Sequence, residues 1–230
     1  MKIVERPSPN QDARDGVGVD MLLLHYTGMT SGEVALARLC DPASKVSAHY
    51  TIDEDGTIYA MVPEARRAWH AGLSFWAGAR DINARSIGIE LVNPGHEFGY
   101  RPFPEAQIGA LTTLCRQILD RHSIPSWRVL GHSDVAPARK DDPGEFFPWA
   151  RLATAGIGLW PAPGNDPGEG AVAPLLARYG YDPDVPLEKT VTAFQRHFRP
   201  SRVDGRADRE TRTMLSGLIA AYDAANGGCA

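Results

Sequence analysis

The chain has 230 residues, 43% of them hydrophobic, which is enough for one large domain or two modest domains with apolar cores. Its formal net charge of −4 gives no global electrostatic case for binding nucleic acid or an anionic membrane. The three cysteines, Cys40, Cys115 and Cys229, lie far apart and are odd in number. This spacing argues against a disulfide framework and against a zinc site built from thiolates.

No apolar run approaches the length of a membrane span, so we expect no integral membrane segment. The stretch from Met1 to Pro9 has neither the apolar segment of a signal peptide nor a cysteine ready for lipid attachment. We therefore expect a cytoplasmic protein, with a periplasmic or outer-membrane location as the alternative if a leader has been removed. The sequence leaves the oligomeric state unknown.

Strand and helix patterns alternate along the first part of the chain. Short apolar runs bounded by turn residues predict strands, and apolar residues at three- and four-residue steps predict helices. The expected elements, in chain order, are a polar arm over residues 5–16, a strand ending at His25, a helix over 31–40 with Ser31 as N-cap, a hairpin of 47–52 and 57–62, a strand over 86–92, a helix over 104–122, a short strand over 127–130 and a helical turn over 147–153. This order predicts an α/β fold, a mixed central sheet flanked by helices, with a site at the edge of the sheet.

The segment from Gly131 to Gly144 crowds an imidazole, an ammonium group and several carboxylates into a loop broken by proline and glycine. Such a loop can aim side chains at one point. His25, at the end of its strand, and His132, in the loop, are candidate zinc ligands, and Asp142 is a candidate third. Three protein ligands leave the fourth tetrahedral position open, as in catalytic zinc sites. Asp141 is a rival ligand that sequence spacing does not separate from Asp142.

Five motifs occur in one order across about residues 18 to 152. They are Leu-Leu-His25-Tyr-Thr, Val46 to Ile52, Ala68-Trp69-His70-Ala71-Gly72, Ser86 to Leu91, and His132 to Gly144. Together they resemble the zinc-dependent N-acetylmuramoyl-L-alanine amidases of the AmpD and AmiD type, relatives of peptidoglycan-recognition proteins and of some phage lysozymes. The AmiD type is the more similar, because the chain continues into a second domain.

The resemblance implies a function and a set of roles. One zinc ion per chain would be held by His25, His132 and Asp142, and Glu90 and Lys140 would assist catalysis. The reaction would be hydrolysis of the amide between N-acetylmuramic acid, or its anhydro form, and the L-alanine of the stem peptide, in peptidoglycan turnover or recycling. The alternative is a module that binds peptidoglycan or muropeptides without cleaving them, which the loss of a ligand would favour; all three are present.

Four further residues in these motifs have less specific expected roles. Trp69 and His70 lie in an irregular segment rich in aromatic residues, and we expect them to contact a sugar-peptide substrate. For His49 we favour a buried, hydrogen-bonded position. Asp134 is expected either to cap the turn that follows it or to orient a ligand.

Proline and glycine dominate residues 161–170, which predicts a linker between an amidase domain of residues 1–160 and a second domain of residues 171–230. The second part shows helical patterns over 171–179, 187–199 and 208–224, and resembles the small three-helix peptidoglycan-binding domain. That family usually has a glycine where this chain has Asp208, although an aspartate there can cap the last helix. The arginines of this part alternate with acids, which favours a solvated face over a polyanion site.

Overall fold

The structure is a computed structural model that describes residues 2–227, so Cys229 lies outside the described residues. The strands are β1 (Ile3–Glu5), β2 (Gln11–Asp12), β3 (Met21–Tyr26), β4 (Tyr50–Ile52), β5 (Ile58–Ala60), β6 (Arg67–Ala68), β7 (Ser86–Leu91) and β8 (Val129–Gly131). The α-helices are α1 (Gly32–Cys40), α2 (Ile82–Arg85), α3 (Gly95–Phe98), α4 (Glu105–His122), α5 (His132–Val135), α6 (Trp149–Thr154), α7 (Val172–Tyr179), α8 (Leu187–Phe198) and α9 (Arg209–Gly227). Short 3₁₀ turns cover Pro42–Ser44, Ser126–Arg128 and Glu169–Ala171.

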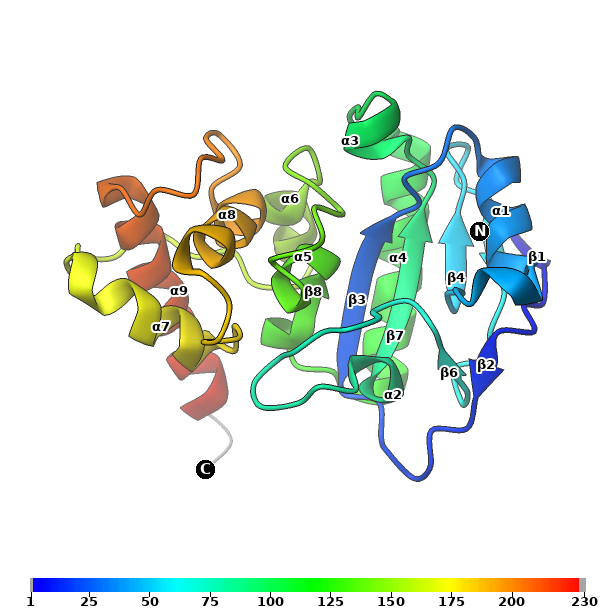
Figure 1. Cartoon of the computed structure of the whole chain (residues 1–230), viewed down its shortest axis with the longest axis horizontal. Helices are drawn as coiled ribbons and strands as arrows, with labels where there is room; N and C mark the ends of the chain where they lie inside the picture. Colours follow the sequence, from blue (N-terminus) through cyan, green and yellow to red (C-terminus); the bar gives the residue numbers. More distant parts are fainter. Residues whose placement is uncertain (1, 228–230) are drawn as a thin grey trace.

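A six-stranded sheet forms the centre of the first part, in the order β1-β5-β4-β7-β3-β8 (Figure 1). Strand β3 runs parallel to both β7 and β8, whereas β4 and β5 form the predicted antiparallel hairpin. The mixed sheet with flanking helices is the predicted α/β fold. The N-terminal residues also form strands, because β1 extends the sheet beside β5 and β2 pairs with β6.

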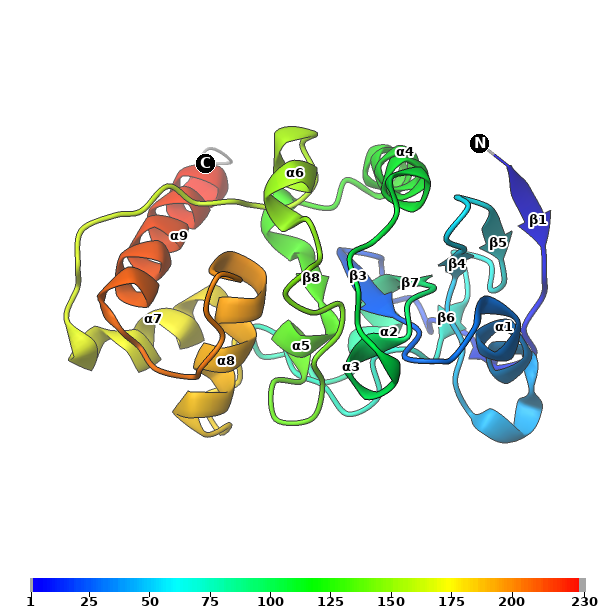
Figure 2. The same ribbon diagram turned by 90° about the horizontal axis from the view of Figure 1, so that it is seen from above.

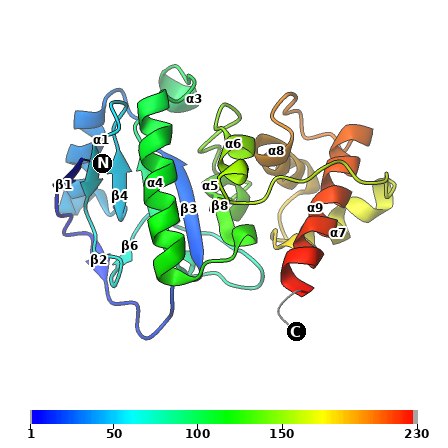
Figure 3. The same cartoon turned by 180° about the vertical axis from the view of Figure 1, so that it is seen from behind.

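The two faces of the sheet have different coverings. Leu22, Leu24 and Ile89 belong to one hydrophobic cluster with the buried side of α4, which crosses the back of the sheet (Figure 3). Side chains alternate along a strand, so His25 and Glu90 belong to the opposite face. Figure 2 shows α4 on one side of the sheet and α1 and α3 on the other.

Two predicted helix features recur in the structure. The Ser31 side chain accepts a hydrogen bond from the backbone N–H of Val34 and so caps α1, as expected. Cys115 is fully buried on the apolar face of α4, where it packs as a small hydrophobic residue. Among residues 2–227, no helix combines the length and apolar character that a bilayer crossing needs.

Helices α7, α8 and α9 lie on the β8 side of the sheet (Figure 1). Asp208 Oδ1 accepts from the backbone N–H of Thr211 at 2.9 Å, which is the predicted cap of the last helix. The arginines near it pair with acids; Arg202, for example, lies 2.8 Å from Asp204. Within residues 2–227 the three helices share their core with the first part, because one hydrophobic cluster joins Leu23 and Trp76 to residues of all three helices. The division into separate domains stays a prediction.

Candidate metal site and cleft

Parallel pairing brings the candidate residues to one edge of the sheet. His25 of β3 and Glu90 of β7 are register partners, so their side chains leave neighbouring strands on the same face. Leu24 pairs with Gly131 of β8, and His132 therefore follows directly beyond the end of that strand. Because carboxyl ends of parallel strands meet at one edge of a sheet, the strand pairing brings these residues to the same edge.

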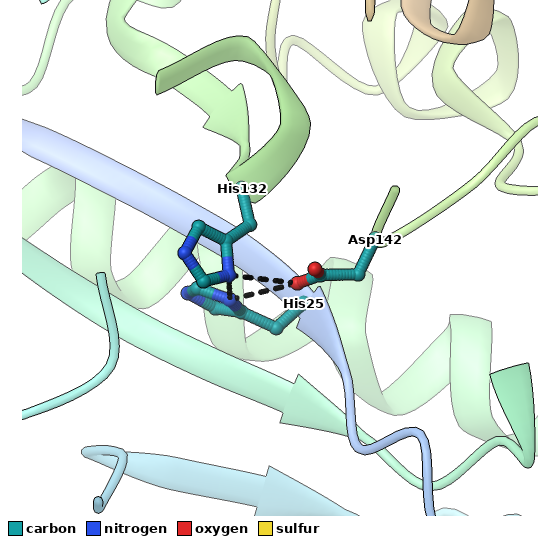
Figure 4. A group of neighbouring side chains, drawn as sticks. All are labelled: His25, His132 and Asp142. Atoms are coloured by element: carbon teal, nitrogen blue, oxygen red, sulfur yellow. Dashed lines mark hydrogen bonds and ion pairs between the residues drawn. The ribbon is translucent and has the colours of Figure 1, made fainter. Parts of the chain in front are cut away.

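His25, His132 and Asp142 converge on one point (Figure 4). His25 Nδ1 lies 3.0 Å from His132 Nδ1 and 3.0 Å from Asp142 Oδ2, and His132 Nδ1 lies 3.1 Å from the same oxygen. All three side chains are buried. The structure thus brings together two residues 117 positions apart in the chain. Asp141, the rival, is exposed and its carboxylate lies 2.8 Å from the Arg196 guanidinium.

Hydrogen bonds determine which nitrogen of His25 carries the proton. Ser86 Oγ donates to the Ile82 carbonyl at 2.7 Å, so it accepts from His70 Nε2 at 3.2 Å. His70 Nδ1 then accepts from His25 Nε2 at 3.0 Å. Burial first, and His132 second, lower the pKa of His25 to about 4, so its imidazole is neutral at pH 7. Its Nδ1 therefore presents a lone pair to the point of convergence.

His132 has the same arrangement. Its Nε2 donates to the Ala71 carbonyl at 2.9 Å, which leaves the lone pair on Nδ1. Two imidazole lone pairs and a carboxylate oxygen then face one another without a proton between them, an arrangement that a cation would stabilise. Tetrahedral zinc bonds of ~2.0–2.1 Å separate neighbouring ligand atoms by ~3.3 Å, close to the spacing of this triad. The donor set therefore fits zinc.

Glu90 lies beside this triad with one unsatisfied atom. Its Oε2 is buried and has no hydrogen-bond partner within residues 2–227. Burial, then the charge of Asp142, raise the pKa of Glu90 well above its usual range, and Lys140 acts in the opposite direction. A carboxyl group with a raised pKa in a cleft is typical of a general acid or base.

A cleft of about 630 Å³ opens next to these groups, within the size range of small-molecule sites. The predicted catalytic residues Glu90 and Lys140 line it, as do Trp69 and His70. Its rim comes from α1, α3 and the loop before Asp142, including Leu39, Phe98 and Arg139.

The aromatic residues of the cleft have well-defined partners. Trp69 Nε1 donates to Asp12 Oδ2 at 2.6 Å, and the nearly buried His70 ring bonds His25 and Ser86. His70 thus contacts a candidate ligand, while substrate contact by Trp69 and His70 stays a prediction. His49 is fully buried and its Nδ1 accepts from a backbone N–H at 2.9 Å, the position favoured from sequence.

Sequence reasoning did not find the groups that surround the histidines. Ser86 was part of a motif but had no role, although period-two alternation puts it on the same strand face as Glu90. Gly88 lies between them, and a Cβ there would come 2.4 Å from the His70 ring. Only glycine lets this ring pack flat on β7. The contacts of Asp134 with the C-terminal helices carried no sequence signal.

Comparison with known proteins finds a family profile and relatives that agree with one another. The profile described as N-acetylmuramoyl-L-alanine amidase matches residues 15–145. The chain is 40% identical over 233 residues to N-acetylmuramoyl-L-alanine amidase AmiD of Escherichia coli strain K12, covering 89% of this chain and 83% of AmiD. It is 34% identical over 164 residues to 1,6-anhydro-N-acetylmuramyl-L-alanine amidase AmpD of the same strain, covering 64% of this chain and 87% of AmpD.

A solved structure extends the likeness to nearly the whole chain. It is the E. coli AmiD complex with the substrate anhydro-N-acetylmuramic acid-L-Ala-D-gamma-Glu-L-Lys, which superimposes with a TM-score of 0.81 at 38% identity. The match covers 94% of this chain and 93% of AmiD, so it includes the C-terminal helices. On the family profile and these relatives, the chain belongs to the N-acetylmuramoyl-L-alanine amidase family.

Proposed function

We propose that the protein is a zinc-dependent amidase that hydrolyses the bond between N-acetylmuramic acid, or its anhydro form, and the L-alanine of the stem peptide. The observation that carries the proposal is the convergence of His25, His132 and Asp142 beside the unpartnered carboxyl of Glu90. The family, and the muropeptide substrate with which AmiD forms its complex, support the substrate class. Peptidoglycan turnover or recycling is the corresponding setting.

One zinc ion per chain would be held by His25 Nδ1, His132 Nδ1 and Asp142 Oδ2. Zinc in such a site supplies Lewis acidity, which polarises a carbonyl and lowers the pKa of water toward ~7. The protein contributes ligands that need no rearrangement: two imidazoles with their Nδ1 atoms already directed inward, and a buried carboxylate. The Nε2 atom of each histidine is hydrogen-bonded, in His25 to His70 and in His132 to the Ala71 carbonyl, which prevents the rings from turning.

Glu90 acts as general base and then as general acid. Its Oε2 takes a proton from the attacking water and returns it to the nitrogen of the leaving L-alanine. The raised pKa suits the first step, because it makes the carboxylate a stronger base than an ordinary glutamate. General acid–base catalysis of this kind contributes typically ~10²–10⁴ in rate.

Lys140 provides positive charge for the tetrahedral oxygen. It is half-buried, lines the cleft and lies two residues before Asp142. Its backbone N–H donates to the Ala136 carbonyl at 3.1 Å, which fixes the start of the side chain. A preorganised donor at a developing oxyanion contributes ~3–4 kcal/mol in comparable sites.

The C-terminal part has a proposed role as well. We propose that α7, α8 and α9 form the three-helix peptidoglycan-binding unit expected from sequence, next to an amidase domain of residues 1–160. Three helical segments at the expected positions and the linker composition support this division.

The test of the catalytic proposal is digestion of purified disaccharide-tetrapeptide, followed by mass analysis. We expect free tetrapeptide and free disaccharide, no cleavage after treatment with a chelator, and recovery of cleavage when zinc is returned. Substrate binding without cleavage in zinc-replete protein would instead support the non-catalytic binding module. Cleavage that persists without metal would contradict the zinc site.

A further inference from the structure

Asp134 lies inside the loop that carries two of the candidate ligands, and it takes no part in the proposed reaction. It is on α5, two residues after His132, and it is buried to 1% exposure. A buried carboxylate is costly unless hydrogen bonds replace its water. Asp134 therefore needs hydrogen-bond donors, and some of these donors belong to the C-terminal part of the chain.

Three donors bind the two carboxylate oxygens of Asp134. The backbone N–H of Gly131, the N-cap residue of α5, donates to Oδ2 at 2.7 Å, so Asp134 caps the start of its own helix and not the turn that follows it. His197 Nδ1 donates to the same oxygen at 2.7 Å, and the Tyr181 hydroxyl donates to Oδ1 at 2.6 Å. Both of these side chains are buried, and both belong to the C-terminal part.

His197 itself is held on two sides. Its ring stacks on Trp149 at 3.8 Å between centroids and on Phe198 at the same distance. Its Nε2 is buried and has no partner within residues 2–227, so the Nδ1 bond to Asp134 is its polar anchor there. On the same helix, the Arg196 guanidinium lies 2.8 Å from Asp141, next to the third candidate ligand. Helix α8 therefore contacts the loop at two points, and Figure 2 shows it beside α5.

Asp134 is tied to both candidate ligands of the loop. It belongs to the same short helix as His132, which is the first residue of α5. The backbone N–H of Ser133 donates to the carbonyl of Asp142 at 2.9 Å, so the two ends of the loop are joined beside Asp134. A shift of α5 would move His132 and Asp142 together.

We propose that Tyr181 and His197 are positioning residues, through which the C-terminal helices hold Asp134 and with it the loop of residues 131–144. The proposal rests on the proposed zinc site, since its purpose is to preorganise two of three ligands. It gives the C-terminal helices a role inside the active site, separate from any contact with the cell wall. Loss of such supporting hydrogen bonds typically weakens metal binding by ~10–100-fold.

The first experiment compares two tyrosines of one core in the full chain. Tyr181→Phe removes the hydroxyl that Asp134 binds, whereas Tyr179→Phe removes a hydroxyl with no hydrogen bond within residues 2–227, in an equally buried ring. Zinc Kd is measured by competition with a chromophoric chelator. We expect Tyr181→Phe to raise Kd by about tenfold or more. Tyr179→Phe should keep Kd within about twofold of the wild type. Equal Kd values for both variants and the wild type would overturn the proposal.

A second pair of variants guards against a general packing effect. His197→Asn keeps an N–H at the position of Nδ1, whereas His197→Leu does not, and both lose the stacking on Trp149. We expect the asparagine variant to bind zinc more tightly than the leucine variant. Equal weakening in both would assign the effect to stacking and contradict the role of the hydrogen bond.

Hydrogen exchange of the metal-free full chain separates this proposal from the zinc site. Backbone amides of residues 131–144 should exchange faster in Tyr181→Phe than in Tyr179→Phe, with or without metal. If the wild type binds no zinc, the proposed function fails, and the exchange comparison still decides whether the helices hold the loop. Identical exchange in the two variants would refute that they do.

Discussion

The two sides of the candidate site are held by different means. His25 and Glu90 are placed by the register of β3 and β7, and His25 is further bonded to His70. His132 and Asp142 lie on a loop that follows β8 and depends on side-chain contacts for its shape. The hydrogen-bond partners of His25 all belong to the first part of the chain. The loop side takes hydrogen bonds from residues that follow the linker.

The two large hydrophobic clusters also differ in which parts of the chain supply their residues. The cluster between the sheet and α4 draws its buried residues only from positions 22 to 157. The other cluster includes Leu23 and Trp76 from the first part, and Tyr181 and Phe194 from the second. Removing water from the sheet face that carries the site therefore requires the C-terminal helices, whereas the α4 face is covered without them. A linker in sequence does not by itself imply separate cores.

The largest expected effect removes one ligand from the loop side. Asp142→Asn should reduce zinc content from one per chain to near zero and lower kcat/KM by at least ~10³, because Lewis acidity contributes several kcal/mol. Asp141→Asn is the comparison variant: its carboxylate faces Arg196 and not the two histidines, so it removes one contact of α8 with the loop but no ligand and should retain zinc. Metal analysis and turnover of a muropeptide measure both. Zinc retained in Asp142→Asn would remove this residue from the ligand set.

The next effect is on the sheet side and leaves the metal in place. Glu90→Gln should lower kcat by ~10²–10⁴ with unchanged zinc content, because the amide cannot move a proton. Glu97→Gln is the control, as Glu97 also lines the cleft but is exposed on α3. An unchanged kcat in Glu90→Gln would exclude Glu90 as the base.

A third prediction tests whether the shared core joins the two parts. Trp76 packs edge-on against Tyr179 and Tyr181, and Ala77 N–H donates to the Gly180 carbonyl at 2.8 Å. Trp76→Ala should cost about 3–5 kcal/mol, which corresponds to a fall in Tm of roughly 6–20 °C for a protein of this size.

Calorimetry should show one transition for the wild type, and Trp76→Ala should move all of it. Leu73→Ala, in the same loop but 87% exposed, should leave Tm unchanged. Two resolved transitions, only one of them shifted by Trp76→Ala, would show that the parts fold independently.

The smallest effect concerns Glu64, which does not line the cleft. Burial raises the pKa of Glu64, but hydrogen bonds from Arg121, His122 and Tyr50 outweigh it and lower the pKa to about 2. A depressed pKa contributes stability above the unfolded value, near 4.5, and this contribution is lost as pH falls toward 2. Glu64→Gln should therefore cost about 1–2 kcal/mol at pH 6, allowing for solvent screening, and less at pH 3.

Urea unfolding at the two pH values measures the change, and zinc Kd should stay at the wild-type value. A zinc Kd that changes in Glu64→Gln would contradict the expectation that Glu64 and its hydrogen-bond partners do not influence the metal site.

Local patterns predicted most of the fold because each depends on neighbouring residues. The Ser31 cap of α1, the period of α4 and the short apolar run of β3 are determined within a few positions, and the structure has all three. The arm was only partly foreseen. Strand β1 has three residues and β2 has two, which is too short for a periodic pattern, and their pairing partners, β5 and β6, are distant in sequence.

The sequence by itself determined the residue types of the site and the strand that ends at His25, since motif and period are local properties. Tertiary structure decided which of two adjacent aspartates meets the histidines, that His70 orients His25, and that Asp134 binds Tyr181 and His197. Each of these outcomes depends on where a side chain points after distant segments have packed. Sequence spacing carries no information about that direction. In the folded protein, the packed sheet and helices allow each of these side chains only one direction.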